Sequence, residues 1–144
     1  MNATSVTVVA AQYAAGTLAV VPWRQWRPDP AGLAAAGLGL ALLTWTLLHN
    51  RFGNWRILPE VKAEARLITD GPYRLVRHPM YLSVLILCAG LAACARDWPN
   101  LVGAVALIPI LILKTRREEV SLRVRFPAYD AYARSTSAFV PGLW

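Results

Sequence analysis

The sequence predicts an all-α membrane protein with four transmembrane helices and a cytoplasmic C-terminal helical extension. Hydrophobic residues make up 56% of its 144 residues and charged residues only 16%, whereas soluble domains contain roughly 45–50% apolar and about 25% charged residues. The apolar residues form four runs, and the basic residues fall between and after these runs. A net charge of +7 divided in this way favours a membrane domain over a nucleic-acid-binding surface.

The first two spans are expected at about 4–22 and 31–49, each close to the ~20 residues that cross a bilayer. The first run lacks the positively charged start of a signal peptide, so we interpret it as a retained span. We expect Gln12 in this run to bond to a neighbouring helix. The second span contains small residues that would let another helix approach closely and would also allow a homodimer, namely Gly32, Ala36, Gly37 and Gly39.

The third and fourth spans are expected at about 79–95 and 98–113. Pro109 should kink the fourth helix or lie where a neighbouring group satisfies the freed carbonyl. Cys88 and Cys94 are six positions apart, so they lie on different sides of the third helix and cannot pair within it. We expect them to be small packing residues.

Beyond the fourth span, the helix is expected to continue over 114–126 outside the membrane, and a short helix to follow over 127–134. The residues 139–144 are apolar and aromatic enough to lie back on the protein or on the membrane interface. The whole chain, 1–144, is expected to be one membrane domain.

The placement of Lys and Arg predicts the orientation in the membrane. Six of the fifteen lie in the long polar loop over 50–78, and six more lie from Lys114 onward. Four spans put these two regions on the same side, which the positive-inside rule assigns to the cytoplasm together with both termini. Apolar side chains between Trp55 and Ile68 argue against disorder in this loop and are expected to pack on the membrane face or to cover a pocket.

The most distinctive stretch is Asp70–Tyr81, which carries turn residues and a Pro-started helix directly before an apolar run. Pro79 is expected to be the first helical residue, and it should hold His78 out of the α region. Free amides near 80–82, Arg77 and the helix dipole would then form an anion-receiving pocket. The alternative is that Arg74 and Arg77 only mark the cytoplasmic edge of a span.

Glu118 and Glu119 lie just beyond the fourth span, on the same side of the membrane as this stretch. We expect i,i+4 pairs between Lys114 and Glu118 and between Glu119 and Arg123. The alternative is that these are ordinary surface ion pairs, each contributing about 0–1 kcal/mol. Facing an anion pocket, the two carboxylates could instead hold the ammonium of a zwitterion. No metal site is predicted, since His49 has no second His or Cys near it in sequence and reads as an interfacial end residue.

These residues carry a resemblance over about 69–141. The chain resembles the isoprenylcysteine carboxyl methyltransferase family and the related phospholipid N-methyltransferases in a set of positions: Gly71-Pro72-Tyr73-Arg74, Arg77-His78-Pro79, Tyr81, Glu118-Glu119, Phe126, Tyr129, Tyr132 and Val140-Pro141. It departs from the family pattern at Ser83, Pro127 and Ala138. The first two spans match only in being apolar.

The resemblance implies an enzyme of the membrane that uses S-adenosylmethionine (SAM), held between segments 69–81 and 114–141. The cofactor-binding residues that it implies are Tyr73, Arg77, His78, Pro79, Tyr81, Glu118 and Glu119. The catalytic residues would be Arg77, which would position a carboxylate acceptor, and Glu119, which would act as a base towards an amine acceptor. The acceptor would be lipid-like or small and apolar, with an isoprenylcysteine-like carboxylate favoured over a phospholipid amine.

Three other classes remain open. A small four-helix transporter would be expected to carry an acid inside a span, whereas all eight Asp and Glu residues lie at or outside the predicted span ends. A scaffold that binds a partner would leave the Arg-His-Pro-x-Tyr stretch unexplained. A nicotinamide-dependent reductase fits the helical arrangement, although no phosphate-binding Gly motif is present.

Overall fold

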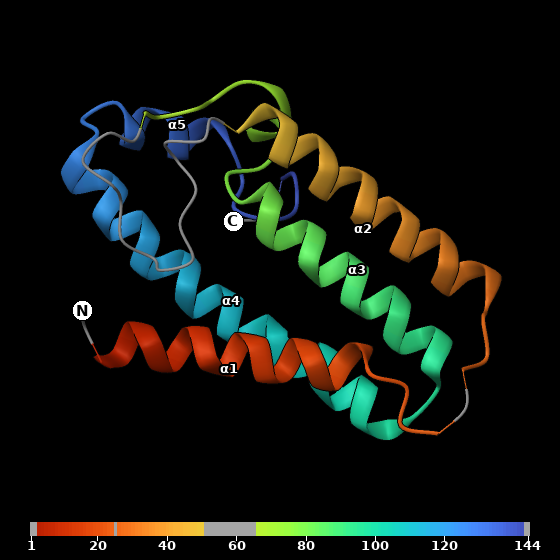
Figure 1. Cartoon of the computed structure of the whole chain (residues 1–144). Helices are drawn as coiled ribbons and strands as arrows, with labels where there is room; N and C mark the ends of the chain where they lie inside the picture. The colour runs from red at the N-terminus through yellow and green to blue at the C-terminus, as the bar shows by residue number, and fades with distance from the viewer. Residues whose placement is uncertain (1–2, 25, 51–65, 143–144) are drawn as a thin grey trace.

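The computed structural model describes residues 3–24, 26–50 and 66–142, and regular structure in these ranges is helical (Figure 1). The elements in chain order are α1 (Ala3–Val20), α2 (Pro30–His49), the 3-10 helix η2 (Gly71–Arg74), α3 (Pro79–Ala95), α4 (Trp98–Arg125) and α5 (Tyr129–Ser135). The apolar residues that were expected in the loop over 51–65 lie outside the described residues. Of that set, Leu67 and Ile68 are described, and both are half-buried.

The helix boundaries follow from local capping chemistry. Proline occupies an early position of α2, α3 and α4, where its missing N–H costs no hydrogen bond. Asp29 caps α2 by accepting a hydrogen bond from the Gly32 amide at 3.0 Å. Helix α4 is continuous through Pro109 to Arg125, as the expected extension beyond 113 requires. The short helix α5 begins at Tyr129, two residues later than predicted.

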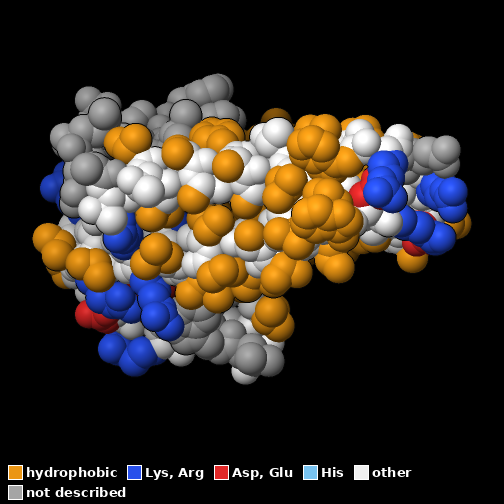
Figure 2. Space-filling view, turned by 90° about the horizontal axis from the view of Figure 1, so that it is seen from below, with side chains coloured by type: hydrophobic (Ala, Val, Ile, Leu, Met, Phe, Trp, Pro, Cys, Tyr) orange, Lys and Arg blue, Asp and Glu red, His pale blue; other side chains and the backbone are white. Residues whose placement is uncertain are grey.

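Two helices among the described residues are long and apolar enough to cross a membrane, α2 and α4. Helix α3 and the stretch Thr4–Val20 are shorter apolar helices. The long helices expose large aliphatic side chains, such as Leu38 with 62% and Leu101 with 63% exposure. Figure 2 shows hydrophobic side chains over the middle of the molecule and Lys and Arg towards its two ends. An exposed apolar belt between charged ends is the surface that a bilayer covers.

The helices pack mainly as α2 against α3 and α1 against α4 (Figure 1). Small residues allow this contact, as predicted for the second span. A Cβ on Gly39 would lie 2.5 Å from the Leu87 amide, and one on Gly90 would lie 2.4 Å from the Ala36 amide. A Cβ on Gly37 would meet nothing within 4 Å. Most of the small-residue face is therefore used within the chain, and a homodimer stays a prediction.

Two polar side chains tie α1 to α4. The side-chain amide of Asn100 donates to the carbonyls of Leu18, Ala19 and Val21, at 3.1, 2.9 and 2.8 Å, and so satisfies the free end of α1. At the other end of the contact, Lys114 donates to Gln12 Oε1 at 2.7 Å. This confirms the expected helix-to-helix bond of Gln12.

The cysteines agree with the packing role expected of them. Cys88 and Cys94 are both free thiols, and both side chains are buried. Each therefore acts as a small apolar residue in the helix contacts.

Candidate functional site

The backbone before α3 is held by the chain segment that follows α5. Val76 and Ser137 form a parallel bridge, and the amides of Arg77 and His78 donate to the carbonyls of Ser137 and Ala138 at 2.8 and 3.1 Å. Phe139 is buried and its ring lies 6.1 Å from the His78 ring. The segment after α5 thus lies back on the protein, as expected, at least as far as Phe139.

The backbone conformation at the start of α3 is as predicted, but two of the backbone amides that were expected to be free are hydrogen-bonded. Pro79 is the first helical residue, and His78 has φ −124° and ψ 60°, outside the α region. The amides of Tyr81 and Leu82 both donate to the His78 carbonyl, at 3.1 and 3.0 Å. The prediction of a pocket lined by free amides near 80–82 is therefore wrong for these two groups, because the His78 carbonyl already closes the first turn.

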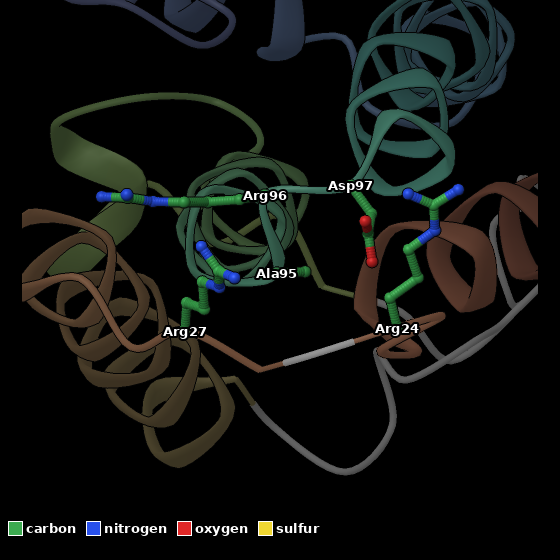
Figure 3. A pocket seen from close by; sticks show the side chains of 5 residues that line it. All are labelled: Arg24, Arg27, Ala95, Arg96 and Asp97. Atoms are coloured by element: carbon green, nitrogen blue, oxygen red, sulfur yellow. The ribbon is translucent and has the colours of Figure 1, made fainter.

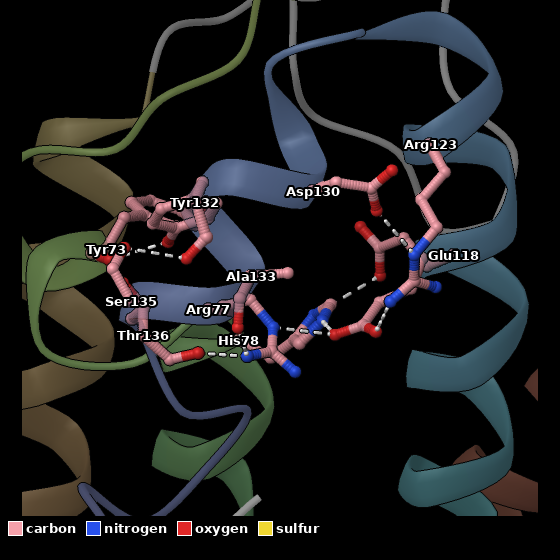
Figure 4. Close-up of polar contacts among 11 residues, drawn as sticks. Tyr73, Arg77, His78, Glu118, Arg123, Asp130, Tyr132, Ala133, Ser135 and Thr136 are labelled. Atoms are coloured by element: carbon pink, nitrogen blue, oxygen red, sulfur yellow. Dashed lines mark hydrogen bonds and ion pairs between the residues drawn. The ribbon is translucent and has the colours of Figure 1, made fainter.

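Arg77 and Glu119 form the centre of the site (Figure 4). Arg77 Nε donates to Glu119 Oε1 at 2.8 Å, and the two side chains are only 6% and 7% exposed. One terminal nitrogen, Nη1, donates to the carbonyls of Ala133 and Thr136. The other, Nη2, has no hydrogen bond or ion pair within the described ranges. Arg77 therefore joins α4 to α5 and keeps one donor group for another partner.

His78 lies between the two acids. Its Nε2 is 3.3 Å from Glu119 Oε1, and its Nδ1 is 3.7 Å from Glu118 Oε2. Tyr81 donates to Glu118 Oε2 at 2.7 Å, and its ring is parallel to that of His78. The Glu118 side chain is 30% exposed, whereas that of Glu119 is 7% exposed. Glu118 is thus the acid with surface left for a ligand.

The environment of Glu119 favours its ionised form. Burial alone would raise its pKa, but hydrogen bonds with His78 and Arg77, together with the Arg77 charge, outweigh burial and lower the pKa to about 2. Arg123 Nη2 adds an ion pair at 3.1 Å, which confirms the predicted i,i+4 pair. Glu119 lies in the part of α4 beyond the apolar run that ends at Leu113. A carboxylate this acidic is a weak proton acceptor at neutral pH.

The other predicted pair forms no hydrogen bond or close ion pair among the described residues, although the Glu118 charge acts on Lys114 at longer range. The Lys114 ammonium bonds to Gln12 and lies 5.1 Å from the centre of the Tyr81 ring. Glu118 accepts from Tyr81 instead. His49 also gains a contact that its sequence position did not predict, since its Nε2 lies 3.2 Å from Asp70 Oδ1.

Tyrosines line the same region from η2 and α5. Tyr132 donates to the Tyr73 carbonyl at 2.6 Å, which ties α5 to η2 (Figure 4). Burial, and then the Glu118 charge, raise the pKa of Tyr73 to about 12. Burial is also the largest cause that raises the pKa of Tyr129 and of Tyr132. All three hydroxyls are therefore protonated donors at neutral pH.

Thr115 Oγ1, one turn before Glu119 on α4, is buried and has no hydrogen-bond partner among the described residues. The buried hydroxyl of Tyr129 on α5 has no partner of good hydrogen-bond geometry there, but it lies near enough to Glu119 for that carboxylate to act as its acceptor and help raise the pKa of Tyr129. Orphaned buried polar atoms are uncommon and call for a ligand or water. Neither was predicted as a site residue, and Thr115 gave no motif signal. Its position four residues before Glu119 is the pattern that could have pointed to it.

The predicted site residues thus meet in one place. Arg77, His78 and Tyr81 contact Glu118 or Glu119 directly, about forty positions further along the chain. Tyr73 joins them through its contact with Tyr132. Pro79 is buried and is the first residue of α3, so it fixes where the helix begins after His78. The departures Ser83 and Ala138 are both fully buried, and the Ser83 hydroxyl donates to the Met80 carbonyl at 2.7 Å.

Two curated bacterial proteins are similar to part of this chain. The nickel-cobalt-cadmium resistance protein NccN of Alcaligenes xylosoxydans xylosoxydans is 36% identical over 84 residues, which are 57% of this chain and 39% of that protein. The cobalt-zinc-cadmium resistance protein CzcN of Cupriavidus metallidurans is 38% identical over 78 residues, 54% of this chain and 36% of that protein. The matches therefore cover well under half the length of these relatives.

Comparison with solved structures gave no match. Residues 29–128 match the family described as Phospholipid methyltransferase (PEMT). This range holds the paired acids, the Arg-His-Pro-x-Tyr segment and the helices that bring them together. The chain belongs to the phospholipid methyltransferase family.

Proposed function

We propose that the chain is a SAM-dependent methyltransferase embedded in the membrane, acting on a lipid-like or small apolar acceptor. The observation that carries the proposal is the buried contact of Arg77 and His78 with Glu119, beside the partly exposed Glu118. Two further observations support the proposal. The chain belongs to a methyltransferase family, and many large hydrophobic side chains are exposed on its surface, as expected of a membrane protein.

The residues present fit a zwitterionic cofactor. The Glu118 carboxylate has exposed surface for an ammonium group, and the buried Thr115 hydroxyl is a donor with no partner among the described residues. When bound, SAM supplies a methyl group that is already activated on a sulfonium. The residues that we propose to hold it are Tyr73, Arg77, His78, Pro79, Tyr81, Glu118 and Glu119.

Within this site we give the two acids different tasks. Glu118 would contact the cofactor's ammonium. Glu119, held by three cationic or hydrogen-bonding partners, would position Arg77 and His78. Arg77 keeps Nη2 for a carboxylate acceptor, which it would align with the methyl group. Arg77 is thus the catalytic residue of this proposal, and Glu119, which was expected to act as a base towards an amine acceptor, is a residue that positions Arg77.

The low pKa of Glu119 favours a carboxylate acceptor over an amine. An amine must lose a proton before it can be methylated, and a group with a pKa of about 2 is poorly matched to remove it. A carboxylate needs no base. We therefore favour methylation of an isoprenylcysteine-like carboxylate, with a phospholipid amine as the alternative.

We further propose that α1 to α4 all span the bilayer and that both termini lie in the cytoplasm. The concentration of Lys and Arg in 50–78 and beyond 113 supports this orientation. An apolar acceptor could then enter sideways from the lipid, while the polar cofactor enters from the cytoplasm. The site lies at the end of the bundle where this division of access is available (Figure 1).

A role in metal resistance is a second candidate, favoured only by the names of the two similar proteins. In the part of the chain that the structure describes, no group of three or more His, Cys, Asp or Glu could hold a metal ion. We therefore propose no direct metal binding. Titration of the purified protein with Co²⁺ would test this, and tight stoichiometric binding would favour the second candidate.

The test of the first proposal is calorimetric titration of the purified protein with S-adenosylhomocysteine. We expect saturable binding, and Glu118→Gln should weaken it about tenfold, as expected for loss of one charge-assisted hydrogen bond. Asp97→Asn is a matched carboxylate control at the opposite end of the bundle and should bind normally. A folded protein that binds no S-adenosylhomocysteine, or that binds a nicotinamide dinucleotide instead, would contradict the proposal.

The acceptor is tested separately with labelled SAM. We expect transfer to an S-prenylated cysteine with a free carboxylate, and little transfer to phosphatidylethanolamine. The reverse preference would favour the phospholipid alternative.

A further inference from the structure

A second polar region lies at the opposite end of the bundle from the site, where the connection between α1 and α2 meets the turn between α3 and α4 (Figure 1). A pocket of about 310 Å³ there is lined by Arg24, Arg27, Ala95, Arg96 and Asp97. Figure 3 shows Arg24 and Arg27 on the two sides of Ala95, with Asp97 on the Arg24 side. Three guanidinium groups against one carboxylate give this lining a net positive charge.

This end of the bundle has few arginines, and they lie together at one pocket. Only three of the fifteen Lys and Arg residues lie outside 50–78 and the region from Lys114 onward, and all three line this one pocket. The positive-inside rule predicts few basic residues on the far side of a membrane protein. Their gathering at one pocket therefore calls for a local reason.

An apolar groove of about 440 Å³ adjoins the pocket, and the two share Arg96 and Asp97. The groove is lined along α3 by residues such as Ala89 and Ala93, and along α4 from Trp98 to Ile108. Ten residues of α helix extend about 15 Å. This is half of the ~30 Å hydrocarbon thickness of a bilayer, so the groove is as deep as one leaflet.

Exposed tryptophans mark the depth of the pocket in the membrane. Trp23, Trp26 and Trp98 are 52%, 41% and 72% exposed, and all three lie at this end of the bundle. Exposed tryptophan gathers at the level of the lipid headgroups. The arginine pocket is thus at headgroup level, and the groove extends from it into the acyl region.

We propose that this pocket and groove bind an anionic phospholipid, with its headgroup on the arginines of the pocket, Arg27 and Arg96 on one side of Ala95 and Arg24 on the other, and one acyl chain in the groove. Guanidinium groups gathered at headgroup depth are complementary in charge and geometry to a lipid phosphate. Arg96 already contacts Asp29 at 3.2 Å, but the Arg96 side chain is 61% exposed. Ion pairs in contact with water contribute about 0–1 kcal/mol, so a phosphate can compete for Arg96. The inference rests on the proposed membrane placement but not on methyl transfer.

The experiment is native mass spectrometry of the full chain in neutral detergent, with phosphatidylglycerol and with phosphatidylcholine of the same acyl chains. We expect phosphatidylglycerol to be retained preferentially. R24Q/R27Q should weaken its retention by about fivefold for each arginine removed, the effect typical of one basic residue at an anionic surface. R24K/R27K should restore it, and R125Q/R134Q at the other end should leave it unchanged.

A second variant tests the groove without altering charge. Ala89→Phe places a ring in the groove and should weaken retention of phosphatidylglycerol, whereas glycerol phosphate, the headgroup alone, should not displace the lipid. Equal retention of the two lipids, unchanged retention in both R24Q/R27Q and Ala89→Phe, or displacement by glycerol phosphate would each overturn the proposal. S-adenosylhomocysteine binding is read separately, so failure of the proposed function would be distinguishable from failure of this one.

Discussion

The two ends of the helical bundle use arginine in opposite ways. At one end, Arg77 is buried and its contacts join Glu119 on α4 to backbone carbonyls at the end of α5. At the other end, Arg96 pairs with Asp29, but their side chains are 61% and 29% exposed. Both are arginine–carboxylate pairs of similar length, 2.8 and 3.2 Å. The contrast teaches that burial and the number of partners, rather than the pair itself, separate an organising contact from a surface contact.

The largest expected difference between the two ends is in stability, when either Arg77 or Arg96 is replaced by alanine. Arg77→Ala should lower the free energy of unfolding by about 3–5 kcal/mol, because it leaves Glu119 buried without its main partner. Arg96→Ala should cost no more than about 1 kcal/mol, since its pair is exposed to water. Denaturant or thermal unfolding in detergent measures both. Similar losses in the two variants would show that the ends do not differ as we infer.

Acid should weaken the buried end through Glu119. Its pKa is lowered from 4.5 to about 2 in the folded protein, so its contribution to stability is present above about pH 4.5 and is lost as the pH falls towards 2. A shift of this size corresponds to stabilisation on the order of 3 kcal/mol. We expect the melting temperature of the wild type to fall more steeply between pH 6 and pH 3 than that of Glu119→Gln. Parallel curves would contradict the low pKa.

The end of the bundle that carries Arg96 also has a buried polar side chain, that of Asn100, which holds two helices together. Asn100 is fully buried and satisfies three carbonyls at the end of α1. Asn100→Ala should destabilise the protein by about 2 kcal/mol, since buried acceptors lose their donor. Thermal unfolding should show this loss without a change in S-adenosylhomocysteine affinity. A change in affinity would mean that the two ends are coupled.

The smallest effect is expected at the rim of the site. Tyr132→Phe removes the hydrogen bond to the Tyr73 carbonyl and should cost about 1 kcal/mol of stability. S-adenosylhomocysteine affinity should fall by a few-fold, because η2 loses its tie to α5. Tyr13→Phe, on the exposed surface of α1, is the control and should change neither quantity. Unchanged affinity in Tyr132→Phe would separate η2 from the cofactor site.

The helices could be predicted from the sequence, because apolar runs show how far a helix extends and prolines mark where it begins. Sequence reasoning also placed Arg77, His78 and Glu119 on one side of the molecule, since span counting needs only topology. It did not predict the direct Arg77–Glu119 pair, because the same residues could equally have faced a ligand from opposite sides. The carbonyls of Ala133 and Thr136 could not have been found, since backbone acceptors leave no mark on residue identity. Helical spacing predicted that Lys114 pairs with Glu118, but in the structure Lys114 donates a hydrogen bond to Gln12 on α1.

The bridge between Val76 and Ser137 has a consequence for how the protein is made. Helices α1 to α4 precede residues 133–139 in the chain, so they can form and pack before these residues have left the ribosome. The cluster around Arg77 could not close, because two of its acceptor carbonyls and the Phe139 ring come from residues 133–139. The cluster around Arg77 therefore closes only after residues 133–139 have been made and have docked on the helices.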